Sequence, residues 1–152
     1  MRLRSLAATL VVLFSASLLL AQAGAQPSSA GPSLYKRLGG YDAIAAVTDD
    51  FVPRLVNDKQ VGRFLLGLSE NSKGHLRQLF VEFVCAGTGG PCVYTGRDMK
   101  TSHKGLGITG SDWDIAVKHL IATLEKFKVP EKEKGELLAV VSSLKGDIVE
   151  KP

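Results

Sequence analysis

The segment GGPCVYTGRDMKTSHKGLGIT, residues 89–109, determines how the rest of the chain is interpreted. It opens with two glycines and a proline, which stop a preceding helix, and it contains Met99 and His103 four residues apart. In a short helix this spacing places both side chains on one face. A histidine on such a face can offer one ring nitrogen to a metal while the other donates to a backbone carbonyl. Most lone histidines among lysines and serines are solvated, so the assignment of His103 depends on its context.

Apolar residues elsewhere in the chain recur at helical spacing. We expect one short helical turn and four longer helices, at residues 33–38, 42–56, 73–88, 111–124 and 130–148. Glycine pairs at 39–40 and 89–90 end the first and third of them, and Ser111 with Asp114 is expected to cap the fourth. No stretch alternates apolar and polar residues with a period of two, so the expected fold class is all-α.

Two glycine pairs that bracket an apolar helix, followed by the Met99–His103 segment, resemble the truncated haemoglobins of the group 1 type. The resemblance extends from about Ser33 to Val149. It implies an all-α fold, the two-over-two helical sandwich of the truncated globins around haem, with His103 as the proximal iron ligand and Met99 against the porphyrin. Neither cysteine belongs to a Cys-x-x-Cys-His motif, so we expect haem b to be held without covalent bonds.

The resemblance places apolar residues on the distal side, where many relatives carry polar ones. Three distal-helix positions at which many relatives have Gln or His are occupied by Leu76, Leu79 and Phe80. Val52 falls where many have Tyr, and Leu65, or Phe64 after a shift of one residue, falls where an aromatic ring covers the haem. A distal hydrogen bond contributes about 1 kcal/mol or more to holding dioxygen, and much less for CO and NO. We therefore expect oxygen to leave this pocket quickly.

Further residues are expected to contact the haem or its edge. By the resemblance they are Val84, Tyr94, Arg97, Leu106, Trp113, Val117 and His75. Arg97, Lys100 and Lys104 can pair with the haem propionates or be solvated charges. The Tyr94 hydroxyl can reach a propionate, or the ring can simply pack in its loop.

His75 and His119 are the other two histidines. The helical register points His75 away from the iron, at the surface near a haem edge. If its helix were rotated or locally unwound, His75 would become a sixth iron ligand. His119 has no partner at ligand spacing, and we interpret it as structural.

Cys85 and Cys92 flank the Gly89-Gly90-Pro91 corner. A reversal of the chain at this corner would bring them close enough for a disulfide. The alternative is a buried thiol at Cys85 and an exposed one at Cys92. The sequence leaves both open.

The N-terminus has the three parts of a secretory signal peptide. Two arginines precede the apolar run that ends at Ala21, and cleavage is expected near Ala23 or Ala25. That run of 16 residues is shorter than the roughly 20 that a membrane-spanning helix needs, which disfavours an uncleaved anchor. We therefore expect a signal peptide at 1–25, a flexible linker at 26–32 and one globin domain at 33–150, in an exported and periplasmic protein with no stable membrane insertion after cleavage.

Composition excludes a nucleic-acid partner. Loss of Arg2 and Arg4 lowers the net charge from +4 to +2, and the remaining charges of both signs are interspersed along the helices. The expected partners are the diatomic gases O2, CO and NO. The expected function is oxygen binding or transport, or nitric-oxide detoxification by dioxygenation. Dioxygenation also needs a reductase. The alternative is an exported haem protein for electron transfer, with His75 as sixth ligand. The oligomeric state is not indicated.

Overall fold

The structure, a computed structural model, describes residues 31–151. The expected signal peptide, 1–25, and residues 26–30 of the expected linker lie outside the described residues. The regular secondary structure of the described residues is helical apart from one isolated backbone bridge. The elements are α1 (Leu34–Arg37), α2 (Gly40–Asn57), the 3-10 helix η1 (Val61–Leu65), α3 (Glu70–Gly87), α4 (Met99–His103), α5 (Gly110–Lys126), α6 (Glu131–Ser142) and α7 (Lys145–Ile148). Among these helices none has the length and apolar character to cross a bilayer.

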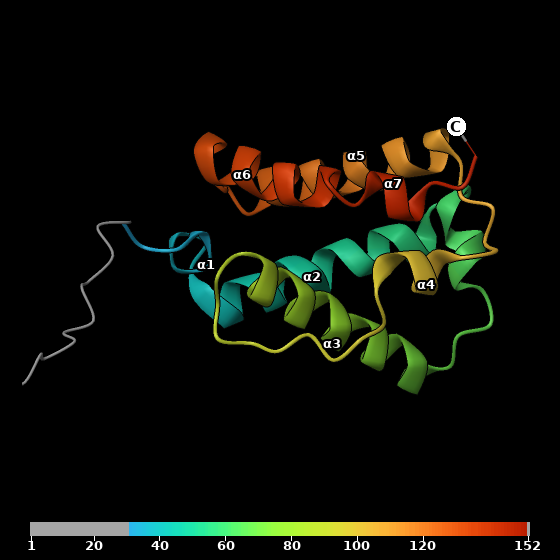
Figure 1. Cartoon of the computed structure of the whole chain (residues 1–152), viewed down its shortest axis with the longest axis horizontal. Helices are drawn as coiled ribbons and strands as arrows, with labels where there is room; N and C mark the ends of the chain where they lie inside the picture. The colour runs from blue at the N-terminus through green and yellow to red at the C-terminus, as the bar shows by residue number, and fades with distance from the viewer. Residues whose placement is uncertain (1–30, 152) are drawn as a thin grey trace, which may run out of the picture.

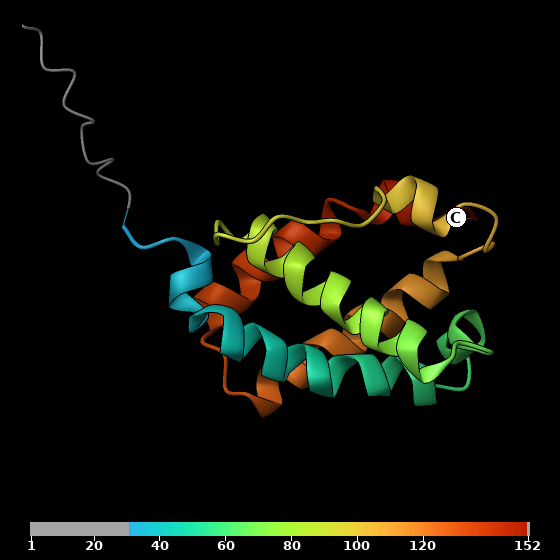
Figure 2. The same ribbon diagram turned by 90° about the horizontal axis from the view of Figure 1, so that it is seen from below.

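The longer helices form two layers (Figure 1). α2 packs against α3 in one layer and against α5, which lies with α6 in the other. α1 lies against α6 at one end of the molecule, and the short helices α4 and α7 lie side by side toward the other end (Figure 2). In this view α3 runs between α2 and the pair formed by α4 and α7.

The hydrophobic core lies toward the α1–α6 end. One cluster of buried residues joins α1, α5 and α6 through Leu34, Leu120, Leu124 and Leu137. A second joins α2 to α3 through Ile44, Val81 and Cys85. The apolar stripe expected from the sequence on α3 is only half-buried, at Leu76, Leu79, Phe80, Phe83 and Val84. The fully buried face of α3 is instead at Val81 and Cys85. Part of the apolar surface of α3 is therefore not covered by other protein side chains.

The expectation that residues 130–148 form one continuous helix is wrong. α6 ends at Ser142 and α7 begins at Lys145. Between them the amide of Leu144 donates to the carbonyl of Val141, three residues back, at 3.0 Å, where a continuous α-helix would bond four residues back. Serines at 142 and 143 and a glycine at 146 are weak helix formers, which is consistent with a break at this point.

The expected cap of α5 is also misplaced, by two residues. The N-cap is Thr109, whose hydroxyl accepts from the Asp112 amide, while the Asp112 carboxylate accepts from the Thr109 amide at 2.9 Å. Thr109 and Asp112 have the same spacing as Ser111 and Asp114, so the pattern alone does not distinguish them. Asp112 also has hydrogen-bond partners outside its helix, and these favour Thr109 over Ser111 as the N-cap.

Asp112 joins η1 to α5 although its side chain is only 1% exposed. Its two oxygens accept from the Arg63 guanidinium at 2.9 and 2.8 Å, and one also accepts from the Gln60 amide at 2.8 Å. Burial raises the pKa of Asp112, but the hydrogen bonds from Gln60, Thr109 and Arg63 outweigh it and hold that pKa well below its ordinary value. The stability that this carboxylate contributes is therefore present near neutral pH and is lost as pH falls.

Cys85 and Cys92 form a disulfide, with Cα atoms 5.7 Å apart. The bond ties the end of α3 to the segment that leads into α4. Inside the closed loop the Gly90 amide donates to the Cys85 carbonyl at 2.8 Å. A Cβ at Gly90 would lie 2.7 Å from the sulfur of Cys85, so this tight corner requires glycine.

We predict that Asp112→Asn lowers the free energy of unfolding by about 2 kcal/mol or more, because it leaves Arg63 with a weaker acceptor and puts an amide donor among donors. Urea denaturation of the purified protein measures this. Asp114→Asn is the control, since Asp114 lies two residues further along the same helix with its side chain 74% exposed. Equal losses in the two variants would contradict the role given to Asp112.

We predict that the protein purified without reducing agent has no free thiol at Cys85 or Cys92 and that reduction exposes two thiols per chain. Cys92→Ser is expected to lower the free energy of unfolding by about 2 kcal/mol, as the chain-entropy model gives for a short closed loop. Val93→Ser, at a neighbouring side chain that is 77% exposed, should change it little. Two free thiols found by mass spectrometry before reduction would remove the disulfide.

Candidate functional site

α4 is a single helical turn that carries both residues of the Met99–His103 spacing. Asp98 caps it: one carboxylate oxygen accepts from the Thr101 amide at 2.8 Å, and the Asp98 carbonyl accepts from the Ser102 amide at 2.9 Å. Hydrogen bonds from Thr101 lower the pKa of Asp98, so the cap is ionised at neutral pH. A helix this short has little intrinsic stability, and it depends on this cap and on its neighbours.

The ring of His103 has a defined direction. Its Nδ1 lies 2.8 Å from the Met99 carbonyl, which can only accept, so Nδ1 carries the proton. The neutral ring then has its lone pair on Nε2, the nitrogen that can coordinate a metal. Metal-binding histidines are usually oriented in this way, by a hydrogen bond from the ring nitrogen that does not bind the metal. His103 is half-buried, so the ring is neither fully solvated nor enclosed by the core.

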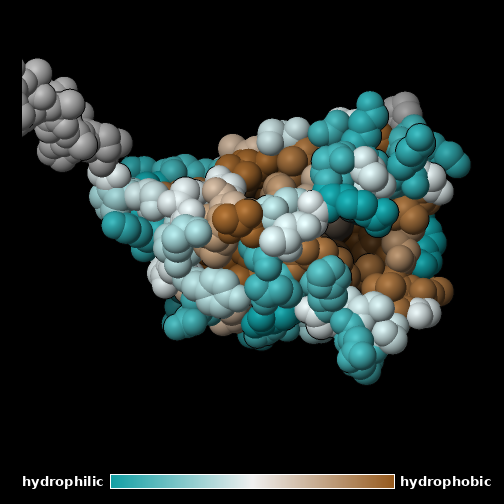
Figure 3. All heavy atoms as spheres, turned by 60° about the horizontal axis from the view of Figure 1, so that its bottom comes forward, coloured by the Kyte–Doolittle hydropathy of each residue, from teal (hydrophilic) through white to brown (hydrophobic). Residues whose placement is uncertain are grey.

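A hollow opens toward the α4 end of the molecule, and hydrophobic residues line much of its border (Figure 3). On α3 the apolar residues Leu76, Leu79 and Phe80 are half-buried and belong to neither core cluster. Met99 on α4 is half-buried as well. An apolar hollow at the same end of the molecule as an oriented histidine is what a large apolar molecule with one nitrogen-bound metal would need.

One histidine is too few to hold a free metal ion, which usually needs three or four protein ligands. In residues 31–151 no group of three or more His, Cys, Asp or Glu side chains is placed to bind one. A metal inside a planar cofactor needs only one or two protein ligands. The donor set therefore fits haem.

The loop before α4 is attached to α3 by more than the disulfide. The Glu82 carboxylate accepts from the amide and the hydroxyl of Thr95, at 3.1 and 2.8 Å. The Tyr94 ring stacks edge-to-face on Phe83 with centroids 5.3 Å apart, and its hydroxyl donates to the Arg97 carbonyl at 2.8 Å. Tyr94 thus packs in its own loop, the second of the two roles expected for it, while the Arg97 side chain is exposed.

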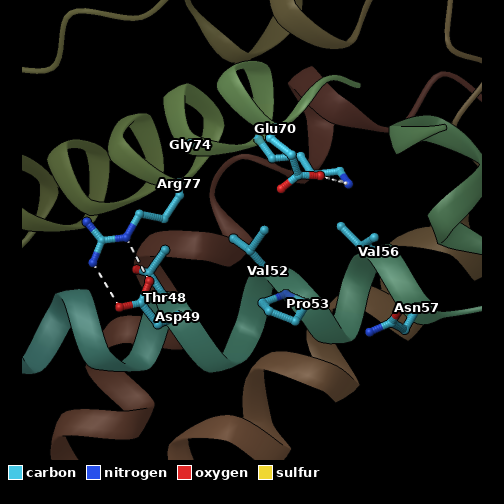
Figure 4. Close-up of a pocket in the computed structure, with 10 residues that line it drawn as sticks. Thr48, Asp49, Val52, Pro53, Val56, Asn57, Glu70, Gly74 and Arg77 are labelled. Carbon is cyan, nitrogen blue, oxygen red and sulfur yellow. Dashed lines mark hydrogen bonds and ion pairs between the residues drawn. The ribbon is translucent and has the colours of Figure 1, made fainter. Parts of the chain in front are cut away.

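The distal residues lie on α2 and α3. Val52 is 7% exposed and projects from α2 toward α3, where it lines a cavity of about 350 Å³ between the two helices (Figure 4). The ion pair of Asp49 with Arg77, at 2.7 and 2.9 Å, joins the helices beside it. Phe80 stacks edge-to-face on Phe51 of α2 with centroids 5.7 Å apart, which fixes its ring against the α2 layer.

The remaining expected contacts are spread over three elements. Phe64 and Leu65 are half-buried on η1, where the Arg63 guanidinium lies 4.3 Å from the centre of the Phe64 ring. Trp113 is buried and Val117 half-buried on α5. Leu106 is 43% exposed in the segment after α4.

The other two histidines have different surroundings. His75 is exposed on α3. His119 of α5 lies 2.9 Å from the Asp58 carboxylate at the end of α2, and this contact holds the pKa of Asp58 at about 2. The structural role expected for His119 is consistent with this hydrogen bond.

Three carboxylates near α4 were not identified from the sequence: Glu82, Asp98 and Glu150. For Asp98 a signal was available, because an Asp directly before a helical turn is a common N-cap. Glu82 and Glu150 contact backbone amides far away in the sequence, at Thr95 and at Gly105 and Gly107. No local pattern predicts such contacts.

Comparison with known proteins identifies the family. The family model of the bacterial-like globins matches residues 33–150. The chain is 35% identical over 116 residues to a group 1 truncated hemoglobin of Mycolicibacterium paratuberculosis, a match that covers 76% of this chain and 83% of the relative. It is 30% identical over 115 residues to a group 1 truncated hemoglobin of Synechocystis, with 73% and 90% covered.

Solved structures show the same fold. The truncated hemoglobin of Tetrahymena pyriformis in its Fe(III) form superposes with a TM-score of 0.73 at 26% identity, covering 79% of this chain and all of the other. The 2/2 hemoglobin of Synechococcus, described with covalently attached heme, gives 0.71 at 25% identity with the same coverage. The all-α truncated-globin fold expected from the sequence is thereby confirmed, and the chain belongs to the bacterial-like globin family.

Proposed function

We propose that this protein binds diatomic gases at a haem iron whose one protein ligand is Nε2 of His103. The observation that carries the proposal is the hydrogen bond of Nδ1 to the Met99 carbonyl at 2.8 Å, which orients the ring and leaves the lone pair on Nε2. Haem bound through this one histidine would supply an iron able to bind O2, CO or NO. Met99 and the apolar stripe of α3 would pack against its faces.

We propose haem b held by coordination and packing. Both cysteines are joined to each other, so neither is free to form a thioether. His119 is occupied by Asp58, and His75 is exposed, which leaves His103 as the histidine suited to the cofactor. The covalently attached heme described for the Synechococcus hemoglobin is a property of that protein.

The pocket proposed above the iron is apolar at its three expected distal positions, while the cavity beside Val52 is also lined by polar groups, among them Thr48 and Arg77. Val52, Leu76 and Phe80 carry no hydrogen-bond donor. The polar side chains between them on α3 are engaged elsewhere: Arg77 with Asp49, and Gln78 with Glu82 at 3.1 Å. Of the diatomic gases, dioxygen depends most on a distal donor. We therefore propose that oxygen leaves this iron quickly, and that CO and NO are held more firmly than oxygen.

The task is then oxygen binding or transport, or the removal of nitric oxide with a reductase as partner. The alternative, an electron-transfer protein with His75 as sixth ligand, needs that side chain to move from the exposed side of α3. The position of His75 supports this less well than a five-coordinate iron.

We also propose export to the periplasm after cleavage near Ala23 or Ala25. The three-part pattern at residues 1–25 supports it, and so does the disulfide, since such bonds persist in oxidising compartments.

We predict that His103→Ala abolishes stable haem uptake or leaves loosely held haem, because it removes the axial ligand. Haem content and the absorption spectrum of the purified protein measure this. His75→Ala is the matched control and should keep the wild-type content and spectrum. A His103→Ala protein with an unchanged spectrum would show that the iron is held elsewhere.

We predict that a donor added to the distal side slows oxygen release. Leu76→Gln or Val52→Tyr should slow it by about tenfold for each 1.4 kcal/mol of hydrogen bonding gained. The CO release rate, measured on the same variant by rapid mixing, should change much less. Leu66→Gln is the control for the substitution itself, since Leu66 is 78% exposed. If oxygen and CO release change equally, the assigned register of α3 is wrong.

A further inference from the structure

The chain turns sharply directly after His103. Lys104 has φ −58° and ψ 128°, and Gly105 has φ 83°. The Leu106 amide donates to the His103 carbonyl at 3.2 Å. These are the features of a type II turn whose first residue is His103 and whose third position requires glycine or a residue that tolerates positive φ. The backbone of His103 is thus part of this turn.

The carboxylate of Glu150 binds the turn. One oxygen accepts from the Gly105 amide at 2.6 Å and the other from the Gly107 amide at 2.5 Å. Gly107 also has positive φ, at 65°, and this geometry aims both amides at one carboxylate. These two hydrogen bonds lower the pKa of Glu150, so it is ionised at neutral pH. We call Glu150 with these two amides the C-terminal clamp.

The backbone around Glu150 holds its side chain in place. The amides of Glu150 and Lys151 both donate to the Ile108 carbonyl, at 2.9 and 3.1 Å. The Gly110 amide donates back to the Lys151 carbonyl at 3.1 Å. α7, which precedes this segment, lies beside α4 (Figure 2). The segment after α7 therefore lies along the connection from α4 to α5.

We propose that Glu150 is a positioning residue for the iron ligand: its carboxylate fixes the turn that begins at His103 and thereby the direction of the imidazole. The inference rests on the proposed function, because it takes His103 as the ligand. Asp98 holds the start of α4, the Met99 carbonyl holds the ring, and the C-terminal clamp holds the far end. Without it, the far end of α4 would be held only by packing against α7.

Glu150→Gln tests the carboxylate with little change in shape. An amide has one accepting oxygen, and its NH2 group would face a backbone N–H, so one hydrogen bond is lost and two donors are opposed. Haem loss to an excess of a haem-scavenging apoprotein is expected to become about three- to tenfold faster, allowing for the exposure of Glu150. The iron–histidine stretching band of the reduced protein should shift or broaden. In the CO complex, the amide protons of Gly105 and Gly107 should move upfield.

Glu131→Gln is the matched control. The Glu131 side chain is 85% exposed and pairs with Lys134 on α6, away from α4. Glu131→Gln should leave haem loss, the iron–histidine stretching band and the amide protons of Gly105 and Gly107 as in the wild type. A chain ending at Val149 removes the clamp and the backbone pairing together and should lose haem at least as fast as Glu150→Gln.

Two results would overturn the inference. If Glu150→Gln moves the two amide protons but leaves haem loss and the stretching band unchanged, the clamp exists and does not position His103. If the amide protons stay in place, the clamp is absent. The proposed function fails separately, if His103→Ala keeps the wild-type spectrum, and the amide shifts would still report the clamp in that case.

Discussion

The hydrogen bond from Nδ1 of His103 to the Met99 carbonyl is the contact on which the proposed chemistry of this protein depends. It determines which ring nitrogen has a lone pair, and it requires a helical turn in which residue 99 precedes residue 103 by four. Five residues make too short a helix to be stable alone. The rest of the proximal side supplies the missing support: the Asp98 cap, the disulfide and Glu82 before the turn, and Glu150 after it.

Apolar surface without a protein partner is the second constraint. The core clusters bury residues of α1, α2, α5, α6 and one face of α3, and leave the other face of α3 only half-buried. Exposed apolar surface costs about 25 cal/mol per Å² relative to burial. A bound cofactor would recover much of this, so binding and folding should support each other. The same face carries no donor at Leu76 or Phe80, which connects this source of stability to the proposed preference among gases.

The sequence predicted those parts of the fold that depend on local pattern. The spacing of Met99 and His103, the glycine pairs and the apolar stripe of residues 73–88 were enough for the all-α class and for the family. The start of α5 was misplaced, because Thr109 and Ser111 begin equivalent capping patterns and only the distant partners of Asp112 choose between them. The Glu150 contacts depend on a chain reversal that no local pattern specifies, whereas the disulfide was one of two alternatives left open at the Gly89-Gly90-Pro91 corner.

The absorption spectrum of the reduced protein, recorded with and without CO, tests the central claim most directly. We expect a five-coordinate high-spin spectrum without CO, since His103 is the proposed axial ligand and His75 lies on the exposed side of α3. Added CO should convert it fully to a six-coordinate low-spin form. Sharp, split low-spin bands before CO is added would contradict the claim, because they require a second protein ligand.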